Sequence, residues 1–407
     1  MIQTPSFSTK GVRWIITFLA FILVISAYPY VFDRFFPLPS MQLVSIVMAI
    51  IFVFFLIVTN KTHSVPIVFT VCFFIQVLTW FFYYFIHDDA SYFTRIFFLL
   101  LAYVTCLVLQ NYGGLLRFMR INTTWIAIQA VLGFVALILV IAGVLSPLLT
   151  SENLDGRPVY FFGITCTNAY YGSLMRPAGF FDEPGALAFW GIYALIFNKL
   201  FINNRKIEYA LVIGLLSTLS LAYFIQITLY FVLFSLKRLR SSIILLGLVG
   251  VLVYVIYSQG DNSGIYELTF QRVENNMING TNRDQMLEDA KDVYSKHPVF
   301  GVGGKNMEKY GYLGDNPYEI LAKDGVVGMI ITYLPFILML FLCKNRNIYF
   351  AMLILSVGYM QRPLHIAFLH YFILYSFFLL CLYAIRNKDA EKQNRLSTIG
   401  NGCYSGV

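Results

Sequence analysis

Long apolar segments separated by short charged segments make up most of the chain. Each apolar segment has about 17 residues or more, the range in which an α-helix crosses a lipid bilayer. The segments lie at about 14–32, 41–59, 64–86, 92–109, 122–145, 186–202, 209–236, 241–257, 326–343 and 348–385. This pattern predicts an all-α polytopic membrane protein, with a single integral membrane domain over residues 1–388.

Two of the segments each predict a pair of helices. Residues 209–236 are too many for one membrane helix, and Lys206 and Lys237 flank them with the same charge, which favours a tight hairpin. Residues 348–385 contain the sequence Gln-Arg-Pro at 361–363, and a proline stops or kinks a helix. With both segments divided, the sequence predicts about 12 transmembrane helices.

The charged residues divide unequally between the two sides of this arrangement. With the N-terminus in the cytoplasm, 17 of the 29 Lys and Arg residues lie in cytoplasmic segments and 18 of the 21 Asp and Glu residues lie outside. Basic cytoplasmic loops are what the positive-inside rule expects. Both termini are then cytoplasmic, and the polar residues 389–407 are expected to form a disordered tail. The first apolar segment is expected to be a membrane helix rather than a cleavable signal peptide.

Composition agrees with this class of protein. Hydrophobic residues make up 58% of the chain and charged residues 12%, about half the charged fraction of soluble domains. These values argue against a nucleic-acid-binding protein, a disulfide scaffold and a disordered chain. Cys166 is the one cysteine expected outside, so no disulfide is predicted there. The sequence has no Walker or Rossmann glycine pattern, and no nucleotide cofactor is expected.

Two polar loops on the outer side, about 146–185 and 258–325, hold the candidate chemistry. The first ends in Arg-Pro-Ala-Gly-Phe-Phe-Asp-Glu-Pro-Gly from Arg176, directly before a helix, and so places an arginine and two acids at the membrane surface. Asp182 or Glu183 has the alternative role of capping that helix, and Arg176 the alternative role of binding a lipid headgroup.

The second loop contains a predicted amphipathic helix. Apolar residues recur at helical spacing over 286–294, and Asn282 is expected to cap the helix. Arg283 in the first turn opposes the helix dipole, which marks it as a functional candidate. A glycine-rich turn, His-Pro-Val-Phe-Gly-Val-Gly-Gly, follows at 297–304, and its histidine, His297, is expected to be structural.

A shorter outer loop carries His87, Asp88 and Asp89. These residue types can bind a metal, but adjacent side chains rarely all face one ion. A solvated loop is the favoured interpretation, and no metal site is predicted.

The order of these motifs resembles the O-antigen ligase/polymerase superfamily of membrane glycosyltransferases, over about residues 150–345. The shared pattern is Arg-x-x-Gly-x-Phe-x-x-Pro before one helix, an arginine at the head of a loop helix, a Pro-x-x-Gly-x-Gly turn, and a polar pair upstream of Gly-x-x-Gly. Ligases of this superfamily carry a histidine followed by an asparagine, where this chain has Asp315-Asn316. The Glu-Pro-Gly after Arg176 is more similar to O-antigen polymerases of the Wzy type.

The resemblance implies a polymerase at the periplasmic face of a Gram-negative inner membrane. Such an enzyme transfers the growing undecaprenyl-pyrophosphate-linked glycan onto the next lipid-linked repeat unit, without a metal or other cofactor. Arg176 and Arg283 match the family motifs and are expected to bind the pyrophosphate and stabilise the leaving group, with Arg272 and Arg362 in support.

A carboxylate near these arginines is expected to act as general base, with Glu183 the first candidate and Asp315 the second. The alternative for Asp315 is a turn residue. The expected partners are the lipid-linked oligosaccharide and membrane lipid, together with a chain-length regulator and a flippase of the same pathway, and no nucleic acid. Two other functions stay open: an O-antigen ligase acting on lipid A-core, and a flippase, for which the spans hold few charges, chiefly Arg95, Arg362 and His370 near span ends.

Overall fold

A computed structural model gives the fold of the chain. It describes residues 14, 17–23, 46, 48–53, 65–111, 114–152, 158–172, 174–181, 183–235, 247, 281–310, 316–342, 345–361 and 368–402. The predicted helices at 14–32, 41–59 and 241–257 lie mostly outside these ranges.

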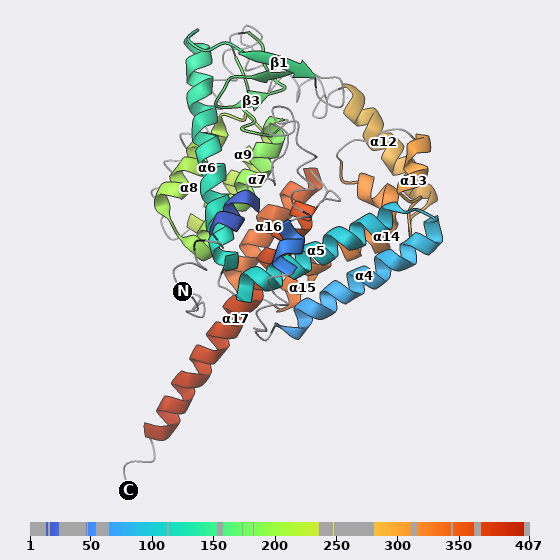
Figure 1. Ribbon diagram of the computed structural model, residues 1–407, viewed down its shortest axis with the longest axis vertical. Helices are drawn as coiled ribbons and strands as arrows, with labels where there is room; N and C mark the ends of the chain where they lie inside the picture. The colour runs from blue at the N-terminus through green and yellow to red at the C-terminus, as the bar shows by residue number, and fades with distance from the viewer. Residues whose placement is uncertain are drawn as a thin grey trace.

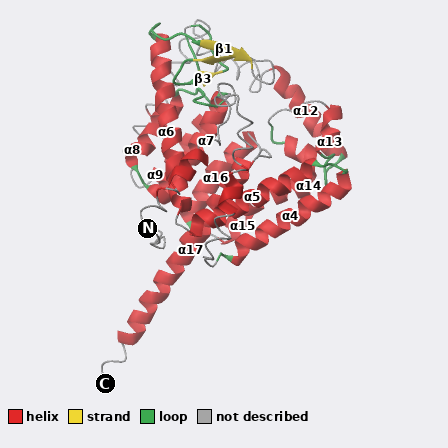
Figure 2. Ribbon diagram, viewed as in Figure 1, coloured by secondary structure: helices red, strands yellow, loops and turns green. Residues whose placement is uncertain are grey.

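Six helical segments in the described ranges are long and apolar enough to cross a membrane, by length and composition. They are α4 (Ile67–His87), α5 (Ser91–Asn111), α6 (Gly114–Ile141), α7 (Pro184–Phe197) continued by η1 (Asn198–Ile202), α14 (Glu319–Thr332) continued by α15 (Leu334–Leu342), and the first half of α17 (Phe368–Gly402). Helices dominate the fold (Figure 2). The structure therefore agrees with a mostly helical, membrane-embedded protein.

Both long apolar segments are divided as predicted. Segment 209–236 forms α8 (Arg205–Leu216) and α9 (Leu221–Ser235), joined by a turn at 217–220. At 1.5 Å per residue, α8 is only about 18 Å long, shorter than the hydrocarbon core of about 30 Å. The last apolar segment forms α16 (Arg346–Gln361) and α17, which begins at Phe368.

The first outer loop contains a small sheet that the sequence analysis did not predict. In the described part of this loop, β1 (Leu149–Glu152), β2 (Pro158–Phe161) and β3 (Cys166–Thr167) pair antiparallel in the order β1-β2-β3. The sheet lies beside the end of α6 (Figure 1). It holds the chain that leads to Arg176.

The second outer loop contains the predicted amphipathic helix, α12 (Thr281–Lys296), and then α13 (Gly304–Met307) and η4 (Glu308–Tyr310). Its apolar face packs on α14 through a cluster of buried side chains: Ala290, Val293, Val302 and Ala322. Both outer-loop structures lie away from the C-terminus (Figure 1).

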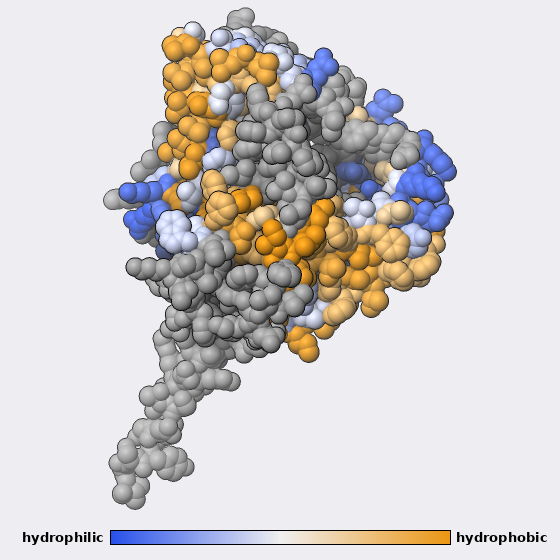
Figure 3. Space-filling model, in the orientation of Figure 1, coloured by the Kyte–Doolittle hydropathy of each residue, from blue (hydrophilic) through white to orange (hydrophobic). Residues whose placement is uncertain are grey.

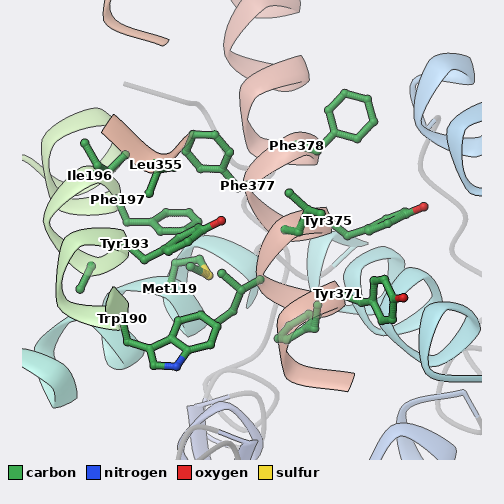
Figure 4. Packing of buried hydrophobic residues seen from close by; sticks show 14 of the residues in the cluster. Met119, Trp190, Tyr193, Ile196, Phe197, Leu355, Tyr371, Tyr375, Phe377 and Phe378 are labelled. Atoms are coloured by element: carbon green, nitrogen blue, oxygen red, sulfur yellow. The ribbon is translucent and has the colours of Figure 1, made fainter. Parts of the chain in front are cut away.

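Aromatic side chains fill the core between α7, α16 and α17. Phe197 and Phe377 pack edge to face with ring centroids 5.3 Å apart, close to Tyr193 (Figure 4). Large apolar side chains such as Leu78 and Phe85 of α4 are exposed. Hydrophobic residues form broad patches on the face of the molecule that Figure 3 shows. Such a surface suits contact with lipid chains.

Trp80 of α4 is fully buried. Its indole packs against the Arg95 guanidinium, so it belongs to the core. The backbone of α17 continues as a helix to Gly402, through most of the expected tail. Good helix formers such as Ala390, Glu391 and Lys392 favour that continuation.

Candidate functional site

The segment that carries Arg176 packs against the middle of α6. A Cβ atom at Gly133 would lie 2.9 Å from the Cβ of Pro177, so the two backbones are in close contact. Gln129 Oε1 accepts a hydrogen bond from the Phe180 amide at 2.9 Å. An α-helix rises 1.5 Å per residue, so Gly133 lies about 12 Å from the end of α6 along the helix axis. The segment therefore packs along the second half of α6.

Backbone hydrogen bonds to the β3 region fix this segment. The Cys166 amide donates to the Gly179 carbonyl oxygen and the Ala178 amide donates to the Cys166 carbonyl oxygen, both at 2.8 Å. The Gly179 amide donates to Thr165 Oγ1 at 3.0 Å. Gly179 has a φ of +65°, and a Cβ there would lie 2.6 Å from Gln129 Oε1. Both the positive φ and the lack of space for a Cβ atom require glycine at this position.

Arg176 connects the outer loop to the tip of the α8–α9 hairpin. Its Nε donates a hydrogen bond to the Thr218 carbonyl oxygen at 2.9 Å. That carbonyl lies in the turn that follows the C-terminal end of α8, where the helix dipole favours a cation. Leu219 in the same turn has a φ of +46°, a left-handed conformation that is uncommon for a leucine. Arg176 itself is partly exposed, so its side chain is not sealed in the core.

Glu183 is the residue before α7 and has an extended backbone. Its side chain makes no capping hydrogen bond, so the capping role considered for it is not realised. Its carbonyl oxygen accepts from the Ala186 amide at 3.1 Å, and Pro184 opens the helix. The partly buried carboxylate thus lies at the positive end of the α7 dipole. Asp182 lies outside the described residues.

The other predicted site residues are placed less fully. Arg283 lies in the first turn of α12, as predicted, and only its backbone is described. Arg272, Asp315 and Arg362 lie outside the described residues. The structure therefore places Arg176 and Glu183 on one segment and leaves the juxtaposition of the remaining candidates as a prediction.

The loop at 87–89 supports the glycine-rich turn, which corrects the interpretation of a merely solvated loop. Asp89 is 6% exposed and accepts hydrogen bonds from the amides of Ser91 at 2.9 Å and Lys305 at 2.8 Å. Burial would raise the pKa of Asp89, but these hydrogen bonds outweigh it and lower the pKa overall. His87 Nε2 hydrogen-bonds with the Phe300 carbonyl group at 3.0 Å. Among the described residues, no group of His, Cys, Asp and Glu side chains can hold a metal ion.

A buried ion pair between α5 and α14 is the main feature that the sequence analysis missed. Arg95 binds Asp324 through both terminal nitrogens, at 2.6 and 3.0 Å, and each residue is 2% exposed. The Tyr92 hydroxyl donates to Asp324 Oδ1 at 2.9 Å. The Arg95 guanidinium lies 4.7 Å from the ring centroids of both Trp80 and Tyr92. The sequence signal for this pair was an acid, Asp324, next to a glycine at the start of a predicted span.

The chain was compared with protein-family models, curated proteins and solved structures, and none of them matches it. The functional inference therefore depends on the sequence motifs and on the geometry described above.

Proposed function

We propose that this protein is an O-antigen polymerase of the Wzy type in a Gram-negative inner membrane, with its active site facing the periplasm. It transfers the growing glycan from undecaprenyl pyrophosphate onto the next lipid-linked repeat unit. The motif order supports the family, and the outer loops support the side of the membrane.

The observation that carries the proposal is the place of Arg176. The segment that packs on α6 holds this arginine against the tip of a short hairpin between two apolar helices. A donor whose pyrophosphate is attached to a prenyl chain stays close to the bilayer, where an arginine held against membrane helices meets it. The guanidinium fork suits phosphate oxygens because it binds two of them at once and stays charged.

The proposed reaction is a displacement at the anomeric carbon of the growing chain. A hydroxyl of the incoming repeat unit forms the new glycosidic bond, and the bond from the anomeric carbon to the pyrophosphate oxygen breaks. Glu183 takes the hydroxyl proton, and undecaprenyl pyrophosphate leaves with the bonding electron pair. Arg176 and Arg283 stabilise the negative charge of this leaving group. Asp315 is the second candidate for the base, and Arg272 and Arg362 support the pyrophosphate.

The buried charges favour an enzyme over a flippase. A flippase needs charged side chains along a polar route through the membrane. In the described spans, Arg95 and Asp324 neutralise each other and are covered by Trp80 and Tyr92. A pair enclosed in this way does not line a route for a glycan.

The test is the gel profile of lipopolysaccharide from cells that lack the gene, with and without a plasmid copy. A polymerase predicts lipid A-core with a single repeat unit, and return of the ladder with the plasmid. Core without any repeat unit would contradict the proposal and indicate a ligase or a flippase. An unchanged ladder would also contradict it and point to another exported polysaccharide.

A further inference from the structure

Helix α14 is interrupted inside a candidate membrane span. Gly325 has a φ of +65° and a ψ of −174°, which no helix contains. The break leaves backbone groups on both sides without helical partners, and an unsatisfied group at membrane depth is costly. The interruption therefore needs partners from elsewhere in the chain.

The glycine-rich turn at 297–304 supplies those partners. On one side of the break, the amides of Val302 and Gly303 donate to the carbonyl oxygens of Ala322 and Lys323, at 3.0 and 2.8 Å. On the other side, the Val326 amide donates to the Pro298 carbonyl oxygen at 2.9 Å. The turn thus forms a short backbone pairing with the broken helix.

Close packing at two glycines makes this pairing specific. A Cβ at Gly301 would lie 2.4 Å from the Lys323 carbonyl, and a Cβ at Gly325 would lie 2.2 Å from the Val299 carbonyl oxygen. The two segments can approach this closely only because both residues lack a side chain.

The buried ion pair involves the residue directly before the same break. Asp324 directly precedes Gly325; its carboxylate is bound by Arg95, and its carbonyl oxygen accepts from the Tyr83 hydroxyl at 2.6 Å. A two-point contact between guanidinium and carboxylate fixes orientation as well as distance. The side chain of Asp324 therefore anchors the last residue before the break to α5, and its carbonyl oxygen is bound to α4.

From these contacts we infer that Arg95 and Asp324 are positioning residues for the second outer loop. The pair holds α14 in the broken geometry that binds the glycine-rich turn. Through Val302 and Ala322, which pack with Ala290 of α12, it sets the place of the helix that carries Arg283. The positioning of the second loop by the ion pair does not depend on the proposed function. The expected effect of the pair on chain growth rests on that function.

Disulfide formation between engineered cysteines tests the pairing without any substrate. The pair Val302→Cys with Ala322→Cys reports whether the glycine-rich turn is packed on α14. The Val302 amide donates to the Ala322 carbonyl oxygen, and both side chains belong to one buried cluster. Ser151→Cys with Val159→Cys, opposite each other in the sheet, reports the fold of the first loop. Each pair is introduced into the full chain, oxidised in membranes, and quantified by mass spectrometry of the linked peptides.

Asp324→Asn is expected to reduce the 302–322 disulfide at least about tenfold, the effect of losing one charged hydrogen bond, and to leave the 151–159 disulfide unchanged. Glu208→Gln is the matched control, because Glu208 also accepts from a cation, Lys199, and from a hydroxyl, Tyr230. It should change neither disulfide. An unchanged 302–322 disulfide in Asp324→Asn would overturn the inference.

Two further variants decide the outcome if Asp324→Asn loses both disulfides. Arg95→Lys keeps the buried charge but not the two-point contact. If this variant loses the 302–322 disulfide and keeps the 151–159 disulfide, the result supports a positioning role for the ion pair. Arg95→Met with Asp324→Leu replaces the ion pair by apolar side chains. Such a replacement often leaves the stability of the folded protein unchanged, so it removes the pair without a general loss of structure. Retention of both disulfides in either variant would overturn the inference.

Chain growth measured in the same variants should fall together with the 302–322 disulfide. A protein with the two introduced cysteines and no other change that forms the 302–322 disulfide but shows no polymerisation in cells, as the wild-type protein also shows none, would contradict the proposed function alone. A disulfide that is independent of Arg95 and Asp324 in an active polymerase would contradict the positioning inference alone.

Discussion

The two outer loops are fixed to the helical bundle in different ways. The first loop depends on side chains: Gln129 binds the Phe180 amide, and Arg176 binds the hairpin tip. The second loop depends on backbone pairing with the broken helix α14, held by the ion pair of Arg95 and Asp324. Both solutions satisfy irregular backbone inside the protein, which is the only place where a membrane bundle tolerates it.

This difference predicts different effects of substitutions in the two loops. In the proposed enzyme the first loop carries Glu183 and Arg176 on one segment, so its changes should act on the rate of chain growth. Changes in the contacts that hold the second loop should act first on structure, and should reach chain growth through the place of α12, which carries Arg283. The following predictions test this division, beginning with the largest effect.

Glu183→Gln should lower the rate of chain growth by about 10² to 10⁴, the usual contribution of a general base. The substitution keeps the size of the side chain, so the protein should express normally. Glu152→Gln in β1, an exposed acid of the same loop, is the control and should leave the rate unchanged. A normal glycan ladder from the Glu183→Gln variant would indicate that Asp315, and not Glu183, is the general base.

Gly325→Ala should break the second loop from the helix. The conformation itself costs an alanine about 1–3 kcal/mol, and the Cβ would lie 2.2 Å from the Val299 carbonyl oxygen. Gly143→Ala provides the control, because Gly143 also has a positive φ of +69° but no atom within 4 Å of its Cβ position. Thermal unfolding in detergent should show a clearly larger fall in Tm for Gly325→Ala. Equal shifts would mean that the close contact is unimportant.

Gln129→Ala should loosen the first loop and leave the second intact. The partly buried Phe180 amide would lose its acceptor, which costs about 0.5–1.5 kcal/mol. We expect a lower Tm and slower chain growth, with an unchanged 302–322 disulfide. Ile128→Ala, on the exposed face of α6, is the control and should affect both measurements much less. Loss of the 302–322 disulfide in Gln129→Ala would show that the two loops are coupled.

Acid should release the second loop through Asp89. Because the folded-state pKa of Asp89 is lowered, its stabilising contribution is complete above the ordinary pKa of about 4 and is lost as the pH falls through the lowered value. Hydrogen exchange of the Lys305 amide, which donates to Asp89, should become faster over that range after correction for intrinsic exchange. Asp89→Asn should remove this pH dependence, and Asp88→Asn, at the exposed neighbour, should retain it.

The sequence predicts those parts of the fold that local patterns determine. Equal charges at both ends indicate the hairpin at 209–236, and apolar spacing over 286–294 indicates α12. The sheet escapes prediction because its strands have only four, four and two residues, too few to show alternation. Helix-forming residues after Arg386 favour the continuation of α17 to Gly402.

The candidate site is predicted in part. The motif places Arg176 and Glu183 before α7, but the packing of the segment on Gly133 of α6 is a long-range contact that no local pattern reveals. The partners Arg95 and Asp324 are 229 residues apart in the chain. A single sequence gives no signal for such a pair beyond the rarity of charge within a span.

The most direct test of the central claim is chain growth by the purified protein in proteoliposomes supplied with lipid-linked repeat units. Arg176→Ala should slow polymerisation by about 10² to 10³, the cost of removing one donor to a developing negative charge, and Arg176→Lys should recover part of the rate. Arg205→Ala, an exposed arginine at the start of α8, should match the wild-type protein. Full chain growth by a folded Arg176→Ala protein would contradict the account.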